Sequence, residues 1–259
     1  LRLVPPPLTA LMLEQLLRRS LASLNDAGDL DFLDGRRLCV RVTDLELAWL
    51  ISREHGRLGL VARGVRSGRS RRAGVLQPFT ELLLSWTMRG ELGSLQEVET
   101  AEAPLQLSGT AMISGFYVNE LLARLLRRED PHPGLYDDYR QTLLLLAQGA
   151  DETYVLRVFE KRLLEHLGYG LLLEHDVDGH AIDPQARYAY LPESGPQLAP
   201  AAQAGTLPGA ALLALAQETP QLVEHGRELR DLLRRALAPH LGDRPLKSRE
   251  LYRQFIRRS

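Results

Sequence analysis

An arginine-rich segment is the strongest chemical signal in the sequence. Between residues 53 and 72 there are seven arginines, and Glu54 is the only acidic residue among them: Arg53, Arg57, Arg63, Arg66, Arg69, Arg71 and Arg72. Guanidinium groups form bidentate hydrogen bonds with phosphate oxygens, and a run of them can follow a nucleic-acid backbone whatever its base sequence. We therefore predict DNA contacts at Arg57 and at the arginines from Arg63 onward. The alternative, which charge alone weighs equally, is a solvated loop that keeps the protein soluble.

A second group of cations lies near the end of the chain. Six basic residues face two acidic ones there: Arg244, Lys247, Arg249, Arg253, Arg257 and Arg258 against Asp243 and Glu250. Lys247, Arg249 and Arg253 are predicted to extend the DNA-binding surface. A frayed cationic tail is the alternative interpretation.

A third pattern combines cations with an apolar stripe in the helix predicted over residues 153–167. Arg157 and Lys161 lie beside Leu156 and Phe159 at helical spacing. An acidic peptide that ends in an apolar residue and a carboxylate needs this pairing of a cation with an apolar surface. These four residues are the predicted peptide-binding site. An ordinary amphipathic helix with solvated cations is the alternative.

The composition excludes several classes of function. The net charge is −1 although 32 residues are basic, so no overall charge attracts nucleic acid. The single cysteine, Cys39, excludes an intrachain disulfide and a multi-cysteine zinc site. His175, Asp176, Asp178, His180 and Asp183 do not match a known metal-ligand spacing, so we expect no metal and no cofactor. The sequence contains no phosphate-binding P-loop, nucleophile elbow or dinucleotide fingerprint, and we expect no enzyme. Without a membrane-spanning apolar run, a cytoplasmic protein is expected.

The elements that must position these residues follow from hydrophobic periodicity. Alternation with a period of two predicts strands near 37–42, 45–52 and 58–63, and further strands in 75–88 and after Gly90. Five short strands interrupted by a glycine- and arginine-rich loop fit a small, partly open barrel of the OB type, and a fragment of a β-sandwich is the alternative.

Beyond Pro104 the period becomes helical. Helices are predicted over 112–128, 136–148, 151–167, 209–217, 222–237 and 248–256, with Asp151 as an N-cap, Gly168 as a C-terminal glycine and a possible hairpin near residues 186–191. The predicted fold is therefore α+β. Its predicted parts are a helical extension over 1–36, a DNA-binding barrel over 37–104, and a helical domain over 105–259 with an irregular insertion at 174–200.

Five segments of the chain resemble the RecO family of bacterial recombinational-repair proteins. They are REHGRLGLVARGVR (53–66), GVLQPFTELLL (74–84), LSGTAMISGFYVNELLARLL (107–126), FEKRLLEHLGYG (159–170) and PLKSRELYRQF (245–255). The resemblance implies an OB-fold followed by a helical domain, and a non-enzymatic protein of the nucleoid that binds single- and double-stranded DNA and anneals single strands. The implied partners are RecR and the acidic C-terminal tail of single-stranded DNA-binding protein, in support of RecA loading. Arg157 is the residue that the resemblance assigns to the tail.

Two departures from the family pattern matter. Some RecO proteins hold zinc through four cysteines in the insertion of the helical domain, and this insertion contains none. Residues 8–52 instead resemble the start of a sterol-carrier-type lipid-binding domain, as in an accessory protein of ubiquinone biosynthesis. The sequence is thus interpreted as a mosaic joined near Arg53, compatible with a natural fusion, a misassembled gene or a designed chimera.

The mosaic leaves three functional interpretations open. If the strands near 37–42 and 45–52 replace the first two barrel strands, a DNA-binding mediator is favoured. A lipid-binding accessory protein is the alternative from another class. In the third, the hybrid start spoils the barrel and leaves a helical scaffold that contacts partners only.

Overall fold

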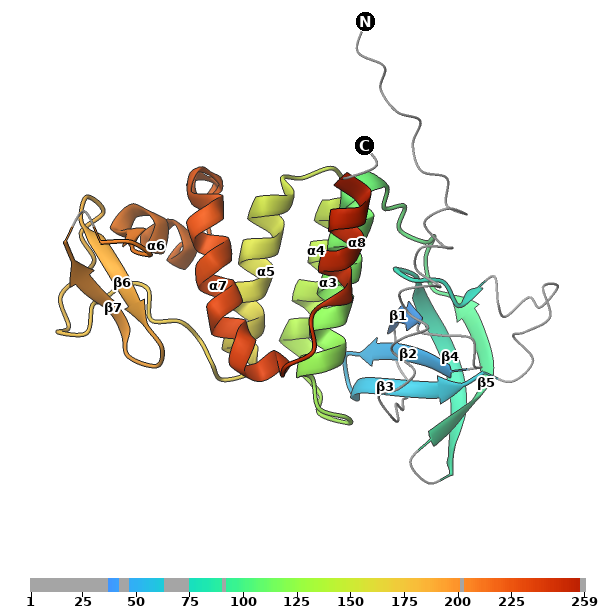
Figure 1. Ribbon diagram of the computed structural model, residues 1–259. Coiled ribbons are helices and arrows are strands. Elements are labelled where there is room, and N and C mark those ends of the chain that lie inside the picture. The colour runs from blue at the N-terminus through green and yellow to red at the C-terminus, as the bar shows by residue number, and fades with distance from the viewer. Residues whose placement is uncertain (1–36, 42–46, 63–74, 90–91, 201–202, 257–259) are drawn as a thin grey trace, which may run out of the picture. The chain divides into compact units, whose positions relative to one another are not determined.

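The computed structural model describes residues 37–41, 47–62, 75–89, 92–200 and 203–256 (Figure 1). The chain forms two compact units. The first comprises residues 1–148 and 244–259, and the second comprises residues 149–243. The predicted helical extension over residues 1–36 lies outside the described residues. Within the described part, no helix combines the length and the apolar character needed to cross a membrane.

The first unit contains a closed five-stranded barrel. Its strands are β1 (Arg37–Arg41), β2 (Leu47–Ser52), β3 (Gly56–Val61), β4 (Glu81–Arg89) and β5 (Leu92–Thr100), in the spatial order β1-β2-β3-β5-β4. Antiparallel pairing of β1 with β4 closes the barrel, and β3 pairs with β5 in parallel. The predicted α+β class and the small barrel are confirmed. The strands of residues 37–52 complete the barrel, which is closed, whereas the sequence predicted a partly open one.

Apolar side chains at alternating positions of the strands fill the barrel interior. Leu50, Leu58, Leu60, Leu82 and Leu95 are buried in one apolar cluster, against which Val98 and Trp86 pack. Burial of these leucines is the main stabilising contribution to the barrel, on the order of 2 kcal/mol for each side chain. Trp86 therefore lies at the edge of the core.

Three helices complete the first unit: α3 (Gly109–Leu125), α4 (Pro133–Ala147) and α8 (Lys247–Ile256). The helix α4 begins three residues earlier than predicted, because a proline is well tolerated in the first turn of a helix. Glu81 at the start of β4 accepts hydrogen bonds from the Tyr136 hydroxyl (3.1 Å) and from Nε of Arg140 (3.3 Å). Both donors lie on α4, so this buried carboxylate links the barrel to that helix.

A glycine allows the barrel to approach the segment that follows α3. Gly56 has a φ of +68°, and a Cβ built on it would lie 2.1 Å from the carbonyl oxygen of Asp130. Only glycine fits this position without a shift of the backbone. The carbonyl oxygen of the next residue, Arg57, accepts a hydrogen bond from the amide of Glu129 (3.3 Å).

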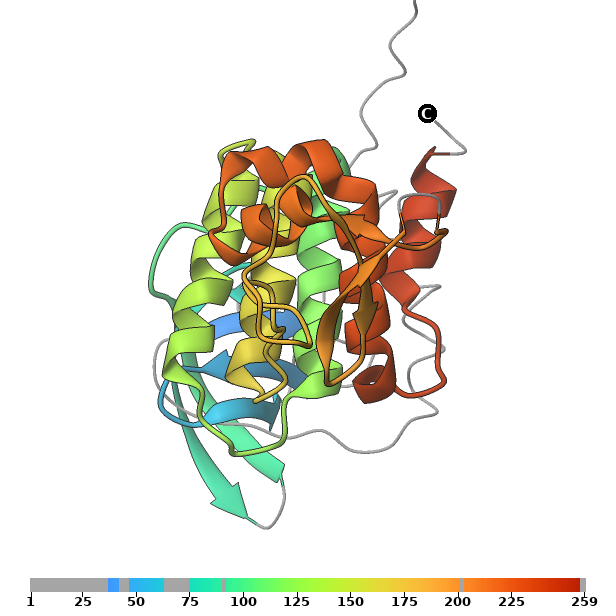
Figure 2. The ribbon, with the colours of Figure 1, turned by 90° about the vertical axis from the view of Figure 1, so that its left-hand side faces the viewer.

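The second unit packs four helical elements with a small sheet (Figures 1 and 2). The helical elements are α5 (Glu152–His166), α6 (Gly209–Ala216), the 3-10 helix η2 (Pro220–His225) and α7 (Gly226–Leu241). The strands β6 (Arg187–Leu191), β7 (Gly195–Ala199) and β8 (Leu207–Pro208) form a sheet in the order β7-β6-β8. Figure 2 looks onto this unit, with the β6–β7 hairpin toward the viewer.

The ends of α5 follow the sequence signals closely. The Asp151 side chain accepts a hydrogen bond from the amide of Tyr154 (3.0 Å), which confirms the predicted N-cap. Gly168 has a φ of +81° just after the helix, which confirms the predicted C-terminal glycine. The segment predicted as one helix over 222–237 is instead divided between η2 and α7, and α7 continues through Pro239 to Leu241.

Candidate nucleic-acid interface

The predicted DNA contacts fall into two groups. Arg57, Lys247, Arg249 and Arg253 lie in described elements, and Arg57 is separated from the other three by most of the sequence. The remaining five lie outside the described residues and stay predictions: Arg63, Arg66, Arg69, Arg71 and Arg72.

Arg57 binds a backbone carbonyl at the C-terminal end of helix α3. Its side chain leaves β3 and donates a hydrogen bond to the carbonyl oxygen of Ala123, in the last turn of α3. A helix leaves these carbonyls without intrahelical partners, and a cation there also interacts favourably with the helix dipole. Burial, together with the nearby charge of Arg128, lowers the pKa of the Arg57 guanidinium to about 10. This environment favours a structural role for Arg57 over a phosphate contact, which needs an accessible guanidinium.

The first turn of α8 is fixed by a carboxylate of α3. Glu120 accepts hydrogen bonds from the amides of Lys247 and Ser248, both at 2.9 Å, and from the Ser248 hydroxyl at 2.8 Å. The first amides of a helix have no intrahelical acceptor, so Glu120 acts as an N-cap supplied by another helix. The pattern places α8 firmly against α3, and Leu251 of α8 is buried.

Arg124, one turn after Glu120 on α3, also binds the segment that leads into α8. Its guanidinium lies 2.7 Å from Glu120 and donates to the carbonyl oxygens of Arg244 (2.6 Å) and Pro245 (2.8 Å). The segment that leads into α8 is therefore held as well as the helix itself. Sequence reasoning missed Glu120 and Arg124 as positioning residues. A spacing of four is compatible with any helical ion pair, and it carries no information about partners that lie about 120 residues away.

Two of the three cations predicted on α8 lie on one side of the helix: Arg253 is exposed and Arg249 is half-buried, whereas Lys247 is a half-buried residue of the first turn. Arg249 and Arg253 lie one turn apart, and within the described residues neither forms an ion pair. Tyr252 and Ile256 lie on the same side, at positions i+3 and i+7 from Arg249, and both are exposed. We call Arg249, Tyr252, Arg253 and Ile256 the α8 stripe. Guanidinium groups in such a row can bind successive phosphates.

The predicted peptide-binding residues are less accessible than their spacing suggested. Arg157 is only 5% exposed, and its Nη2 donates to Glu160 at 2.8 Å. Its Nε and Nη1 are buried without a hydrogen-bond partner among the described residues. Phe159 is buried in the core, and Leu156 is half-buried. Arg157 and Phe159 are two residues apart and therefore lie on different sides of α5, and both are buried within the unit.

Lys161, the fourth residue of that predicted site, is engaged by acidic side chains. Its Nζ lies 3.0 Å from Glu218 and 3.3 Å from Glu165. Glu218 also accepts hydrogen bonds from Arg162. Burial raises the pKa of the Glu218 carboxyl, but the hydrogen bonds from Arg162 and Lys161 outweigh burial and hold the pKa below its usual value. This cluster ties α5 to the turn after α6.

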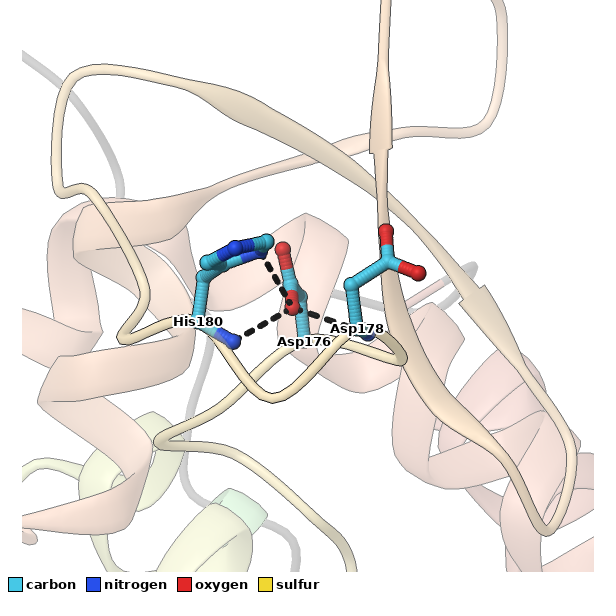
Figure 3. Close-up of side chains that lie close together, drawn as sticks. All are labelled: Asp176, Asp178 and His180. Carbon is cyan, nitrogen blue, oxygen red and sulfur yellow. Dashed lines mark hydrogen bonds and ion pairs between the residues drawn. The ribbon is translucent and has the colours of Figure 1, made fainter.

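Three possible metal ligands meet in the turn that precedes the hairpin (Figure 3). Ligand atoms of Asp176, Asp178 and His180 lie within 4.8 Å of one another. One oxygen of Asp176 accepts hydrogen bonds from the amides of Asp178 (3.0 Å) and His180 (2.8 Å). Burial works against its ionisation, but these hydrogen bonds lower the pKa of the carboxyl. Asp176 is thus explained as the residue that orders the turn.

Comparison with known families divides the chain near residue 105. The model described as "Recombination protein O N terminal" matches residues 45–104, and that described as "Recombination protein O C terminal" matches residues 106–250. The first match begins eight residues before Arg53, where the sequence placed the join, and it includes all of β2. The resemblance of residues 8–52 to a sterol-carrier domain is not supported by these comparisons.

Curated relatives named "DNA repair protein RecO" match most of the chain. The protein of Alkalilimnicola ehrlichii is 50% identical over 212 residues, which cover 80% of this chain and 84% of the relative. The relatives from Methylococcus capsulatus and Pseudomonas aeruginosa are each 46% identical, over 79% and 76% of this chain and 84% and 83% of the respective relative.

Proposed function

Because this chain belongs to the RecO family, we propose that it is a non-enzymatic DNA-binding mediator of recombinational repair. In this proposal it binds and anneals single strands at the nucleoid and, with RecR, helps to load RecA on DNA coated with single-stranded DNA-binding protein. The relatives' names support a role in DNA repair. No step requires a catalytic group, since annealing forms only non-covalent contacts.

The observation that carries the proposal is the row of cations on α8. The half-buried Arg249 and the exposed Arg253 lie one turn apart on a helix whose first turn is held by Glu120. Cations in a fixed row can neutralise phosphates on two strands, which lowers the repulsion between the strands during annealing. The arginines of residues 63–72 would extend this surface if they bind DNA as predicted.

The salt dependence of DNA binding tests this interface. The variant Arg249→Gln/Arg253→Gln should bind a single-stranded oligonucleotide more weakly. The slope of log K against log salt should become shallower by roughly 0.7 for each phosphate that the variant no longer neutralises. The readout is fluorescence anisotropy of a labelled oligonucleotide across a salt titration, together with the rate at which complementary oligonucleotides anneal.

A charge-matched variant serves as the control. Arg227→Gln/Arg235→Gln removes the same charge from exposed positions of α7, where neither arginine forms an ion pair within the described residues. This control should keep the slope of the parent protein. Equal reductions in affinity for the two variants would mean that only net charge matters, and an unchanged slope in the α8 variant would remove α8 from the interface.

The tail of single-stranded DNA-binding protein is proposed to dock at α5. Two nitrogens of the Arg157 guanidinium have no hydrogen-bond partner among the described residues, and the half-buried Leu156 adjoins it in the sequence. A peptide carboxylate would supply the acceptors that this cation lacks. Because Arg157 is buried against Glu160, docking requires this ion pair to open first.

A further inference from the structure

The α8 stripe exposes apolar side chains as well as cations. Tyr252 is 44% exposed and Ile256 is 54% exposed, on the same side of the helix as Arg249 and Arg253. The opposite side of α8 already buries Leu251 in the first unit. A short amphipathic helix needs only one apolar side for packing, and the exposed faces of Tyr252 and Ile256 lie outside the part of α8 that Leu251 buries.

The spacing within the α8 stripe suits a nucleic-acid strand. Residues three and four apart on a helix are neighbours on its surface, so both guanidinium groups lie on the side of α8 that carries Tyr252. An aromatic ring offers a face on which a base can stack, while the flanking cations bind the phosphates on either side of it. Every base has such a face, and stacking therefore tolerates any sequence.

The shape of the surface favours a base over the apolar side chain of a peptide. An apolar peptide anchor needs a concave pocket that buries it, whereas stacking needs only one accessible face of a ring. An exposed helix side is convex. The α8 stripe is also positioned before any ligand binds, because Glu120 and Arg124 hold the start of the helix, and binding then costs less conformational entropy.

We propose that Tyr252 is a base-stacking residue, and that the α8 stripe therefore binds unpaired nucleic acid in preference to duplex. This inference rests on the proposed function and adds to it the strand state that the interface selects. In a duplex the base faces are already stacked on each other, so Tyr252 has no base to receive. The two arginines contact phosphates in either case.

The variant Tyr252→Ala tests the proposal by comparing two forms of one oligonucleotide. Its affinity for the single strand should fall by about fivefold to a hundredfold, the range seen when a stacking aromatic is removed. Its affinity for the duplex should stay close to that of the parent protein. The slope of log K against log salt should also be unchanged, since both arginines still bind their phosphates. The variant Arg253→Gln should show the opposite pattern, with a shallower slope on both forms.

Two further variants separate stacking from a general effect on folding. Tyr252→Trp should keep or raise the affinity for the single strand, and its fluorescence should be quenched by the oligonucleotide. Leu198→Ala shortens an exposed apolar residue of β7 and should change neither affinity. All variants should melt at the temperature of the parent protein.

The outcomes that overturn the inference are distinct from failure of the proposed function. Equal reductions in affinity for single strand and duplex, or no reduction for either, would exclude stacking at Tyr252. Intact binding of DNA with abolished binding to a short acidic peptide would assign the α8 stripe to a protein partner instead. If the parent protein bound neither form of the oligonucleotide, the proposed function itself would fail.

Discussion

Arg157 and Glu160 form a buried ion pair in which the cation has spare hydrogen-bonding capacity. Removing one partner of such a pair leaves the other charge uncompensated, at a cost of about 3–5 kcal/mol of stability. Replacing both by apolar residues of similar volume is often neutral. These opposite effects allow the binding role of Arg157 to be separated from its effect on folding.

The double variant Arg157→Met/Glu160→Leu should retain the melting temperature of the parent protein and fail to bind the tail peptide. The single variant Glu160→Gln should bind the peptide more tightly, because it releases the guanidinium from a charged competitor. Anisotropy of a labelled acidic peptide with a free apolar C-terminus measures both. Retained peptide binding in the double variant would contradict the site, and neither variant should change binding to DNA.

The ion pairs of Glu218 with Lys161 and Arg162 predict that stability depends on pH. The folded-state pKa of Glu218 lies below its unfolded value, so the contribution is present above about pH 4.5 and is lost as pH falls through the folded pKa. Glu218→Gln should therefore destabilise the protein by about 1 kcal/mol at neutral pH, since Arg162 is partly solvated, and less in acid. Thermal melts from neutral to acidic pH test this against Glu193→Gln, an exposed turn position. The prediction would be contradicted if the difference in melting temperature between the parent protein and Glu218→Gln stayed the same from neutral to acidic pH.

The sequence predicted which residues could form the candidate sites, but it did not predict which of them are buried. Spacing predicted an accessible apolar stripe that contains Phe159, with Arg157 beside it. In the structure α5 packs against α6, η2 and α7. This packing buries more of the helix surface than one stripe, and the buried part includes Arg157. Arg57 shows the same limit: a basic segment predicted a phosphate contact, whereas its acceptor is a carbonyl 66 residues away. Local spacing carries no information about such distant partners.

At the scale of elements, Glu120 is the residue that joins two helices. Its carboxylate caps α8 while its backbone belongs to α3. Removal of an N-cap acceptor costs a helix about 1 kcal/mol. In the proposed function this interaction also determines where the α8 stripe lies.

Glu120→Ala should therefore weaken binding to single-stranded DNA by several-fold. Simple electrostatics predicts the reverse, because removing an acid raises the positive charge near the α8 stripe. The control Glu250→Gln removes an exposed acid from α8 itself and should strengthen binding slightly. Anisotropy at fixed salt measures both variants. Stronger binding by Glu120→Ala would show that charge, and not the position of α8, controls affinity.

Element types and approximate bounds were largely accessible from periodicity. The strands of the barrel follow their alternation, and α5 follows its capping signals at both ends. Closure of the barrel was not predictable in the same way. It depends on the register of β1 against β4, where Leu38 lies opposite Glu81, a pairing between strands separated by about 40 residues.

At the scale of the whole molecule, the first unit is discontinuous in sequence. The chain leaves it after residue 148, forms the second unit, and returns at residue 244 with α8. The periodicity of the sequence divided the chain once, between barrel and helices, and did not indicate that the last helix packs with α3. Family membership, by contrast, was predictable because five motifs occur in a fixed order.

The return of the chain has a consequence for the protein during its synthesis. Glu120 leaves the ribosome long before Lys247 does, and domains begin to fold from the N-terminal side as the chain emerges. The barrel, α3 and α4 are therefore available early, while the Glu120 carboxylate has no α8 to cap until the residues after the second unit are made. A nascent chain has no assembled α8 stripe. In the proposed function, DNA contact through this helix therefore begins only after the whole second unit has been synthesised.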